Sequence, residues 1–285
     1  MYIFQKAADL RSQLKTILRG RRSNAIGFIP TMGALHEGHL ALIRAAQADG
    51  CYTVCSIFVN PTQFNDPSDL SKYPRTPEKD AELLAEVGCD VIFMPEVEEI
   101  YPPGVNQDFE IDFEGLDLVM EGFFRPGHFK GVAQVVKRLL DLVDPGKLYM
   151  GQKDFQQVAI VRHLIRVTGV PVQLVVVPTV READGLAMSS RNVRLSPEGR
   201  IKGPIIYQTL LAAKSMATNG TLPAEISREA MAALSDAGFE PEYFEIADAE
   251  TLQPVQTMQE APEVVACVAA WLDGVRLIDN MTLIG

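Results

Sequence analysis

The chain has 285 residues, of which 47% are hydrophobic and 22% charged, a globular composition that excludes disorder, collagen and coiled coil for the whole chain. Because domains average about 150 residues, the length predicts one large domain or two ordinary ones. The 26 Lys and Arg against 37 Asp and Glu give a net charge of −11, which disfavours a nucleic-acid partner because an acidic surface repels phosphate backbones. A small anionic substrate would need a pocket of concentrated positive charge.

The cysteines and apolar segments indicate a cytoplasmic protein. The four cysteines are scattered, with no C-x-x-C pair, and we interpret them as reduced thiols. The first six residues turn polar before a signal-peptide core develops. The apolar run from Val264 to Leu272 is too short to cross a bilayer. We therefore expect a cytoplasmic protein with no membrane partner.

Hydrophobic periodicity predicts alternating helices and strands over the first part of the chain. A strand-helix alternation is typical of a parallel sheet covered by helices, so we predict an α/β fold with a Rossmann-like nucleotide- and substrate-binding domain over residues 1–180. Thr76 is the expected N-cap of one helix. Residues 109–113 alternate in polarity and predict an edge strand or hairpin arm. The other predicted elements are helices over 4–18, 39–48, 77–88 and 154–168, and strands over 25–29, 52–59, 90–94, 147–150 and 172–177.

The pattern changes after residue 180. Residues 181–196 lack periodicity and predict a loop or linker. Two helices, over 197–217 and 223–237, are then followed by strands, and such segregation of helices from strands indicates a separate α+β unit. We predict a smaller α+β C-terminal domain over 181–285, which would act as a lid over the active site. Its expected strands cover 243–247, 264–271 and 275–278.

Two of the four histidines fall in His36-Glu37-Gly38-His39, between the predicted strand over 25–29 and its following helix. Open α/β sheets bind ligands at this end of their strands, and the unpaired N–H groups and dipole of a helix N-terminus favour phosphate. Imidazoles three residues apart can lie on one helix face and donate hydrogen bonds to charge that develops on phosphorus. Surface or helix-capping histidines in an ordinary loop are the alternative. We favour nucleotide binding because two histidines occur together at this turn.

Three further polar segments fall at predicted strand ends or at the domain junction. Residues 188–192 carry two hydroxyls and a guanidinium that could close over a polyphosphate, or they form a hydrophilic linker. Residues 151–157 place Lys153 and Gln157 at a strand end, or they form a polar first helical turn with Asp154 as N-cap. Residues 58–64 place Gln63 beside an apolar ring, or they form a plain loop. Because parallel strand ends share one edge of a sheet, the segments together predict one cleft.

These segments together resemble the pantothenate synthetases, or pantoate–β-alanine ligases, of the H-x-G-H nucleotidyltransferase superfamily. The resemblance implies ATP-dependent condensation of (R)-pantoate with β-alanine to give pantothenate, AMP and pyrophosphate through a pantoyl adenylate. It also implies a homodimer. The matching residues run in family order and are Pro30 to Leu40, Phe58 to Phe64, Tyr73 to Thr76, Arg125 to Phe129, Gly151 to Gln157 and Met188 to Asn192.

The resemblance also implies a role for individual residues. His39 would donate a proton or stabilise transition-state charge, and the expected catalytic residues are His39, His36, Lys153 and Arg191. The expected ATP-binding residues are Met32, Gly33, Ala34, Leu35, His36, Glu37, Gly38, His39, Gly151, Gln152, Lys153, Asp154, Val180, Met188, Ser189, Ser190 and Arg191. Gln63 and Gln157 would bind pantoate, and Gln63 would also contact β-alanine.

Other positions match the family without a role that we can derive, or depart from it. Members of the family can carry adjacent acids after the Tyr-Pro-Arg-Thr segment that are proposed to meet magnesium, whereas this chain has Glu78-Lys79-Asp80. We assign no metal ligand and expect Mg²⁺ to bridge ATP phosphates with mostly water ligands. Met32 and Phe64 are suitable apolar walls for pantoate, or simply packing. Arg125 and His128 have no derived role and are as consistent with a structured turn.

Two other functions remain open at this point. A nucleotidyltransferase that transfers AMP to a phosphate acceptor would need only the histidine motif and a basic loop. A non-catalytic ATP-binding sensor could use the same fold. Transfer-RNA charging is disfavoured by the acidity of the chain and by the absence of a recognisable anticodon-binding extension.

Overall fold

The computed structural model describes residues 1–17, 26–64, 67–104 and 109–285, and the chain forms two compact units. The first unit comprises Met1–Phe113, Arg125–Gln152 and Ile160–Pro178. The second comprises Glu114–Phe124, Lys153–Ala159 and Thr179–Gly285. The two units are therefore not two continuous stretches of chain, because two segments from before residue 160 belong to the second. The domain boundary at residue 180 stays a prediction.

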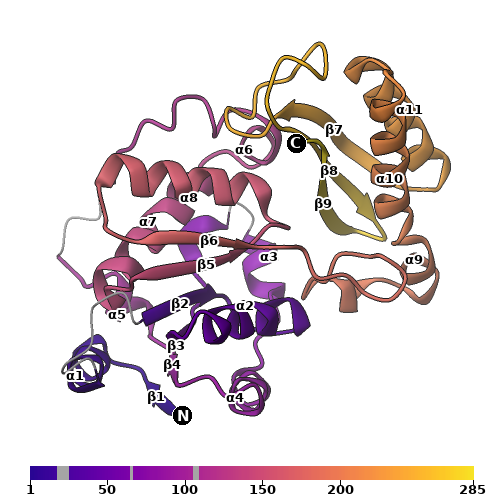
Figure 1. Cartoon of the computed structure of the whole chain (residues 1–285). Coiled ribbons are helices and arrows are strands. Elements are labelled where there is room, and N and C mark those ends of the chain that lie inside the picture. The colour runs from indigo at the N-terminus through magenta and orange to yellow at the C-terminus, as the bar shows by residue number, and fades with distance from the viewer. Residues whose placement is uncertain (18–25, 65–66, 105–108) are drawn as a thin grey trace. The chain divides into compact units, whose positions relative to one another are not determined.

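A parallel sheet of six strands forms the first unit within the described residues (Figure 1). Its order is β1-β4-β3-β2-β5-β6, so the chain moves from β2 to one side and later continues with β5 on the other. The point between β2 and β5 is where strand order reverses, and open α/β sheets bind ligands there. The bounds are β1 Tyr2–Phe4, β2 Ile26–Thr31, β3 Tyr52–Ile57, β4 Val91–Phe93, β5 Lys147–Gly151 and β6 Gln173–Val177.

Helices cover both sides of this sheet. Figure 1 shows α2 on one side and α8 on the other. On the α2 side, Ile43 of α2 and Leu84 of α4 pack with Ile29, Ile92 and Tyr149 of the strands, all of them fully buried. The helices are α1 Ala7–Ile17, α2 Glu37–Ala48, α3 Pro67–Lys72, α4 Pro77–Glu86, α5 Val97–Ile100, α7 His128–Val143 and α8 Phe155–Thr168, with the 3₁₀ helix η2 at Pro61–Gln63.

The predicted Rossmann-like α/β architecture is confirmed, with differences at several elements. Phe4 belongs to β1, and the first helix begins at Ala7; the predicted Leu18 of that helix and Ala25 of the next strand lie outside the described residues. No strand forms over 109–113. Its alternation is real, since Phe113 is buried, but a strand needs a neighbour to pair with, and the Asp112 carbonyl instead contacts a histidine ring.

Two helical predictions were incomplete. α7 was not predicted, although its apolar residues recur at helical spacing and eleven of its residues are buried. The single helix expected over 197–217 is two helices, α9 at Pro197–Lys202 and α10 at Ile205–Thr218. Gly203 and Pro204 separate them, and Pro204 lacks the N–H that would continue a helix.

The second unit contains a three-stranded antiparallel sheet with two helices packed on one face. The strands are in the order β7-β8-β9, and α10 and α11 contribute Leu210, Ile226 and Leu234 to a core shared with Phe244 and Val268. This confirms the predicted smaller α+β region. The bounds are α6 Met120–Phe124, η3 Asn192–Arg194, α11 Pro223–Asp236, β7 Glu240–Asp248, β8 Val264–Leu272 and β9 Val275–Ile284.

A partly buried ion network fixes Glu114–Phe124 to the sheet of the second unit. Nη1 of Arg276 donates to Oε2 of Glu121 at 2.6 Å, and its Nη2 donates to Oε2 of Glu242 at 2.6 Å. The Tyr243 hydroxyl also donates to Glu121, at 2.8 Å. Burial alone would lower the pKa of Arg276, but the two carboxylates raise it above its usual value. The segment is therefore an integral part of the second unit.

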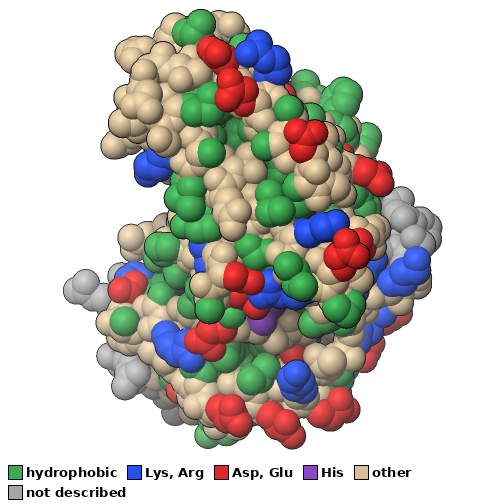
Figure 2. All heavy atoms as spheres, turned by 90° about the vertical axis from the view of Figure 1, so that its right-hand side faces the viewer, with side chains coloured by type: hydrophobic (Ala, Val, Ile, Leu, Met, Phe, Trp, Pro, Cys, Tyr) green, Lys and Arg blue, Asp and Glu red, His purple; other side chains and the backbone are tan. Residues whose placement is uncertain are grey.

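The surface agrees with a globular protein of mixed charge. On the face drawn in Figure 2, acidic and basic side chains are interspersed, with hydrophobic side chains between them. Among the described helices, none is long and apolar enough to cross a membrane.

Candidate active site

The turn between β2 and α2 is bent by two residues with positive φ. Gly33 has φ +84° and Ala34 has φ +50°. A Cβ on Gly33 would lie 2.9 Å from Oδ2 of Asp80 and 3.0 Å from Cγ2 of Ile57, and L side chains also rarely adopt this φ. Glycine is therefore required at Gly33, where the turn lies directly against the Asp80 carboxylate.

His36 and His39 cap the N-terminus of α2 reciprocally. The N–H of Gly38 donates to Nδ1 of His36 at 3.1 Å, and the N–H of His36 donates to Nδ1 of His39 at 3.3 Å. The ring centroids are 4.1 Å apart. Because each Nδ1 accepts a hydrogen bond, each neutral imidazole carries its hydrogen on Nε2. The histidines do cap a helix, and the cap leaves both rings in the tautomer that donates from Nε2.

This turn occupies the edge of the sheet where strand order reverses. β2 ends at Thr31, directly before the turn, and the neighbouring strand β5 ends at Gly151. The N–H of Gln152 then donates to the carbonyl of Val177 at the end of β6. The structure thus brings residues 32–39 and Gly151-Gln152 to one edge of the sheet, beside a helix N-terminus that favours anions.

Gln63 lies beside Met32 at the end of η2. Its Nε2 is 3.1 Å from Sδ of Met32, and its Oε1 accepts a hydrogen bond of 3.2 Å from Nδ2 of Asn60. Asn60 is itself held, because its Oδ1 accepts from the Tyr101 hydroxyl at 2.9 Å and its Nδ2 donates to the Gly131 carbonyl at 3.2 Å. Asn60 thus orients the Gln63 amide, a role that was not predicted from the sequence. The signal available in the sequence was the position of Asn60 shortly after β3, at the edge of the sheet where ligands bind.

Arg125 and His128 support this segment from the side of α7. The His128 ring donates from Nδ1 to the Gln63 carbonyl at 2.8 Å, and its Nε2 is 3.4 Å from Nη1 of Arg125. At Gly131, a Cβ would lie only 2.3 Å from the Thr62 carbonyl oxygen. α7 therefore approaches η2 at a glycine and fixes the backbone that carries Gln63.

In the second unit, residues 180–188 form a short hairpin. The N–H of Met188 donates to the Val180 carbonyl at 3.0 Å, and Arg181 pairs with Ala187. Nδ2 of Asn192 closes the base of the hairpin by donating to the Ala187 carbonyl at 3.0 Å. The region predicted as a loop thus holds Val180 and Met188 next to each other and continues into η3.

Strand β9 anchors two of the predicted ATP-binding segments. Nδ2 of Asn280 donates to the Lys153 carbonyl at 2.9 Å. The Asp279 carboxylate accepts two hydrogen bonds from Arg181, at 2.6 and 3.0 Å, and the Arg181 guanidinium lies over the Tyr207 ring. Asp279 and Asn280 were not predicted, because they lie in a strand far along the chain from the residues they hold.

The two neighbouring glutamines of α8 differ in their surroundings. Gln156 is 4% exposed. Its Nε2 donates to the carbonyls of Leu116 and Val119 at 2.7 and 2.8 Å, and its Oε1 accepts from the N–H of Glu121. Gln156 therefore stabilises the Glu114–Phe124 segment, whereas Gln157 is half-buried on the first turn of the helix.

The predicted site residues thus fall into two sets. His36, His39 and Gln63 belong to the first unit, with the rest of residues 32–39 and with Gly151-Gln152. The second unit carries the remainder, namely Lys153, Asp154, Gln157, Val180, Met188, Ser189, Ser190 and Arg191. Within the second unit, hydrogen bonds place Val180 beside Met188 and tie the Lys153 carbonyl to β9.

The described residues form no preassembled cluster of metal ligands. Over this part of the chain, no group of three or more His, Cys, Asp or Glu side chains could hold an ion. Asp80, in the segment where family members can carry magnesium-binding acids, is 1% exposed, and its two oxygens accept three hydrogen bonds.

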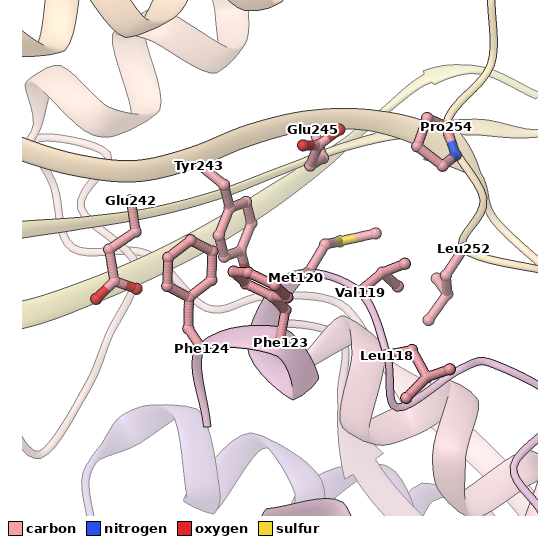
Figure 3. Close-up of a pocket in the computed structure, with 10 residues that line it drawn as sticks. All are labelled: Leu118, Val119, Met120, Phe123, Phe124, Glu242, Tyr243, Glu245, Leu252 and Pro254. Carbon is pink, nitrogen blue, oxygen red and sulfur yellow. The ribbon is translucent and has the colours of Figure 1, made fainter. Parts of the chain in front are cut away.

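A separate hollow of about 300 Å³ lies within the second unit (Figure 3). Its walls are mostly apolar. Glu245 of β7 also lines the hollow, and burial raises the pKa of its carboxyl group above the ordinary value. None of the predicted site residues lines it, so we assign it no part in the predicted reaction. The lining residues are Leu118, Val119, Met120, Phe123, Phe124, Glu242, Tyr243, Glu245, Leu252 and Pro254.

The H-x-G-H class of Rossmann-like proteins has an open parallel sheet with a histidine-capped helix at its switch point, the place where strand order reverses. This chain has that fold and that turn. A family model described as Pantoate-beta-alanine ligase matches residues 2–282. The chain belongs to this family of ligases and is an enzyme.

Relatives and solved structures agree with this membership. The chain is 46% identical over 284 residues to the pantothenate synthetase of Porphyromonas gingivalis, covering 99% of each chain. It is 44% identical over 266 residues to that of Cytophaga hutchinsonii, covering 93% of each. The structure of the Thermus thermophilus pantothenate synthetase matches with a TM-score of 0.92 at 43% identity, over 100% of both chains. The Francisella tularensis pantoate-beta-alanine ligase, complexed with beta-gamma ATP and beta-alanine, matches with a TM-score of 0.82 at 32% identity, over 99% and 98%.

Proposed function

We propose that this chain condenses (R)-pantoate with β-alanine at the expense of ATP. In the first step a carboxylate oxygen of pantoate attacks the α-phosphorus, and the bond from that phosphorus to the bridging oxygen of the β-phosphate breaks. Pyrophosphate leaves and pantoyl adenylate forms. In the second step the amine of β-alanine attacks the acyl carbon, AMP leaves, and the nitrogen loses a proton to give pantothenate. No covalent bond to the enzyme is required.

The observation that carries this proposal is the reciprocal histidine cap at the switch point. His36 and His39 combine Nε2–H donors with the N-terminal amides and dipole of α2, a concentration of positive potential in a chain of net charge −11. Preorganised donors of this kind suit phosphoryl and nucleotidyl transfer, where the protein mainly positions the groups and stabilises developing charge. We therefore assign residues 32–39 to ATP, with His39 as proton donor or stabiliser of the transition state.

The ATP assignment extends to the second unit. We assign Gly151 to Asp154, Val180 and Met188 to Arg191 to the nucleotide, with Lys153 and Arg191 neutralising the departing pyrophosphate. The bond from Asn280 to the Lys153 carbonyl and the hairpin over 180–188 support this assignment, because they fix the backbone that carries these residues and charge stabilisation requires positioned donors. The Francisella tularensis relative was solved with beta-gamma ATP and beta-alanine, which supports the same substrates here.

Gln63 and Gln157 are assigned to pantoate, and Gln63 also to β-alanine. The Gln63 amide is oriented by Asn60, and its Nε2 carries a second hydrogen besides the one directed at Met32. That hydrogen can donate to a hydroxyl or carboxylate oxygen. The thioether of Met32 beside it offers an apolar wall for the branched carbon of pantoate.

Magnesium is assigned to ATP rather than to a protein cage. The oxygens of Asp80 are occupied by hydrogen bonds from the protein, so we propose that Mg²⁺ enters with ATP and keeps phosphate and water ligands. It would supply neutralisation of phosphate charge.

Pantoate-dependent exchange of labelled pyrophosphate into ATP tests the proposal. Exchange is expected without β-alanine, because the first step needs only pantoate and ATP. AMP and pantothenate should accumulate only when all three substrates are present. Formation of ADP would contradict the proposal, and a stable dinucleotide formed from phosphopantetheine or a pyridine mononucleotide would indicate a nucleotidyltransferase. Nucleotide binding by calorimetry with no pyrophosphate release would indicate a sensor.

A further inference from the structure

We propose that Asp80 is a positioning residue that holds the turn over residues 32–39 in its binding conformation, and that it is not a magnesium ligand. The proposal rests on the assignment of this turn to ATP made above. Asp80 lies in the first turn of α4, remote in sequence from the turn itself. Asp80 acts through the backbone of the turn and not by touching the reacting atoms.

The contacts of Asp80 join α4 to the turn. The N–H of Ala34 donates to Oδ2 at 2.9 Å, and the N–H of Leu35 donates to Oδ1 at 2.8 Å. The hydroxyl of Thr76 also donates to Oδ1, at 3.1 Å. Thr76 is the N-cap residue of α4, but its side chain makes no cap bond and is directed to this carboxylate instead. Asp80 is 1% exposed, so these three donors take the place of water.

These bonds fix the part of the turn that leads into the histidine cap. Ala34 is a non-glycine residue with positive φ, a conformation that needs support from its surroundings. Hydrogen bonds to a carboxylate are roughly twice as strong as those between neutral groups. The bond from Leu35 fixes the residue directly before His36. His36 is the N-cap residue of α2 and has an extended backbone. Asp80 thereby sets the direction in which the chain enters the cap.

The same contacts argue against magnesium at Asp80. A carboxylate offers about four lone-pair positions, and three hydrogen bonds already converge on this one in a buried setting. Mg²⁺ requires near-octahedral coordination with short bonds and keeps several waters. Binding it here would displace the amides of Ala34 and Leu35 and open the turn.

Asp80→Asn is the first test, with Asp90→Asn as its matched control. Asp90 precedes β4 and accepts from the N–H and the hydroxyl of Thr53 at 2.8 and 2.9 Å. It therefore makes the same kind of bonds in the same unit, at the opposite end of the strands from the turn. An asparagine at either position keeps the shape but replaces one acceptor oxygen with a donor. Pyrophosphate exchange, magnesium dependence, thermal unfolding and hydrogen–deuterium exchange are measured for both variants and the wild type.

For Asp80→Asn we expect kcat/KM for ATP to fall about 100-fold, the usual effect of displacing a binding group by roughly 1 Å. The peptide covering residues 32–40 should exchange deuterium faster, while the magnesium concentration for half-maximal rate stays unchanged. We expect the thermal midpoint to fall by a similar amount in both variants. Asp90→Asn should nevertheless keep wild-type kinetics and wild-type deuterium exchange over residues 32–40.

Several outcomes would overturn the proposal. Wild-type kinetics in Asp80→Asn, or equal losses in both variants, would show that Asp80 does not position the turn. Recovery of the Asp80→Asn rate by excess magnesium would reinstate it as a metal ligand. If the wild type shows no pyrophosphate exchange, the proposed function fails, and the deuterium exchange over 32–40 still decides whether Asp80 holds the turn. If Asp80→Asn does not fold, Thr76→Val removes only one donor, and it should lower kcat/KM for ATP about threefold to tenfold; no change would count against the proposal.

Discussion

Replacing Gly131 with alanine would test whether α7 sets the position of Gln63. A Cβ at Gly131 would lie 2.3 Å from the Thr62 carbonyl oxygen and 2.9 Å from Cα of Gln63. Contacts of a Cβ closer than 3.4 Å are rare, and both neighbours here are backbone atoms that cannot rotate away. α7 and η2 must therefore separate by about 1 Å.

That separation would break two hydrogen bonds. The bond from His128 to the Gln63 carbonyl is 2.8 Å long and the bond from Asn60 to the Gly131 carbonyl is 3.2 Å, and lengthening by about 1 Å takes both beyond hydrogen-bond range. Each contributes about 1 kcal/mol, and alanine returns about 1 kcal/mol of helix propensity. With an overpacking cost of about 1–3 kcal/mol added, we expect Gly131→Ala to lower the free energy of unfolding by about 2–4 kcal/mol. The thermal midpoint should fall by about 2–4 °C for each kcal/mol.

The effect on activity should be specific to pantoate. Because Gln63 would be displaced by about 1 Å, kcat/KM for pantoate should fall about 100-fold, whereas the KM for ATP should stay near the wild-type value. Pyrophosphate exchange at varied pantoate and varied ATP measures both quantities. Lys130→Ala, at an exposed position on the same helix, is the control and should change neither. A folded Gly131→Ala variant with wild-type pantoate kinetics would refute the assignment of Gln63.

Asp279→Asn should weaken the two bonds to Arg181, lower the free energy of unfolding by about 1–3 kcal/mol and raise the KM for ATP. Calorimetry measures the stability, and pyrophosphate-exchange kinetics measure the KM. An unchanged KM would count against β9 as an anchor of the ATP-binding segments. His39→Ala should fold but lose about 10²–10³ in turnover, and near-wild-type turnover would make the imidazole incidental. Burial raises the pKa of the Cys55 and Cys267 thiols. At a pH near the ordinary thiol pKa of about 8.5 both therefore stay protonated, and mass spectrometry after iodoacetamide should find neither modified until the protein unfolds.

The elements predicted well were those whose sequence determines them locally. β2, β3, β5 and β8 are short, mostly buried runs bounded by turns. α4 begins at Pro77, as its N-cap pattern indicates, yet the Thr76 side chain bonds to Asp80 instead of capping. α7 carried a clear helical pattern and was predictable. β1 was not, because three residues are too few to show a period.

In the candidate site, too, only the features set by local sequence were predicted. The turn over residues 32–39 was found because its glycine and histidines are contiguous in the sequence. The contacts of Asp80 with Ala34, and of Asn280 with Lys153, join residues far apart in the chain. Neither contact can be predicted from the periodicity of the sequence, because each depends on how the fold brings distant parts of the chain together.

The path of the chain through its two units has a consequence for attempts to dissect this protein. A fragment beginning at residue 181 would keep the pair between Arg276 and Glu242 but would lose Glu121, the second carboxylate on Arg276, which comes from an earlier segment. Removing one partner from a partly buried ion network is destabilising. The fragment would also lack Gln156. We therefore expect the portion after residue 180 to be less stable alone than in the whole chain, and recombining homologous genes at this junction would exchange one half of an ion network while retaining the other.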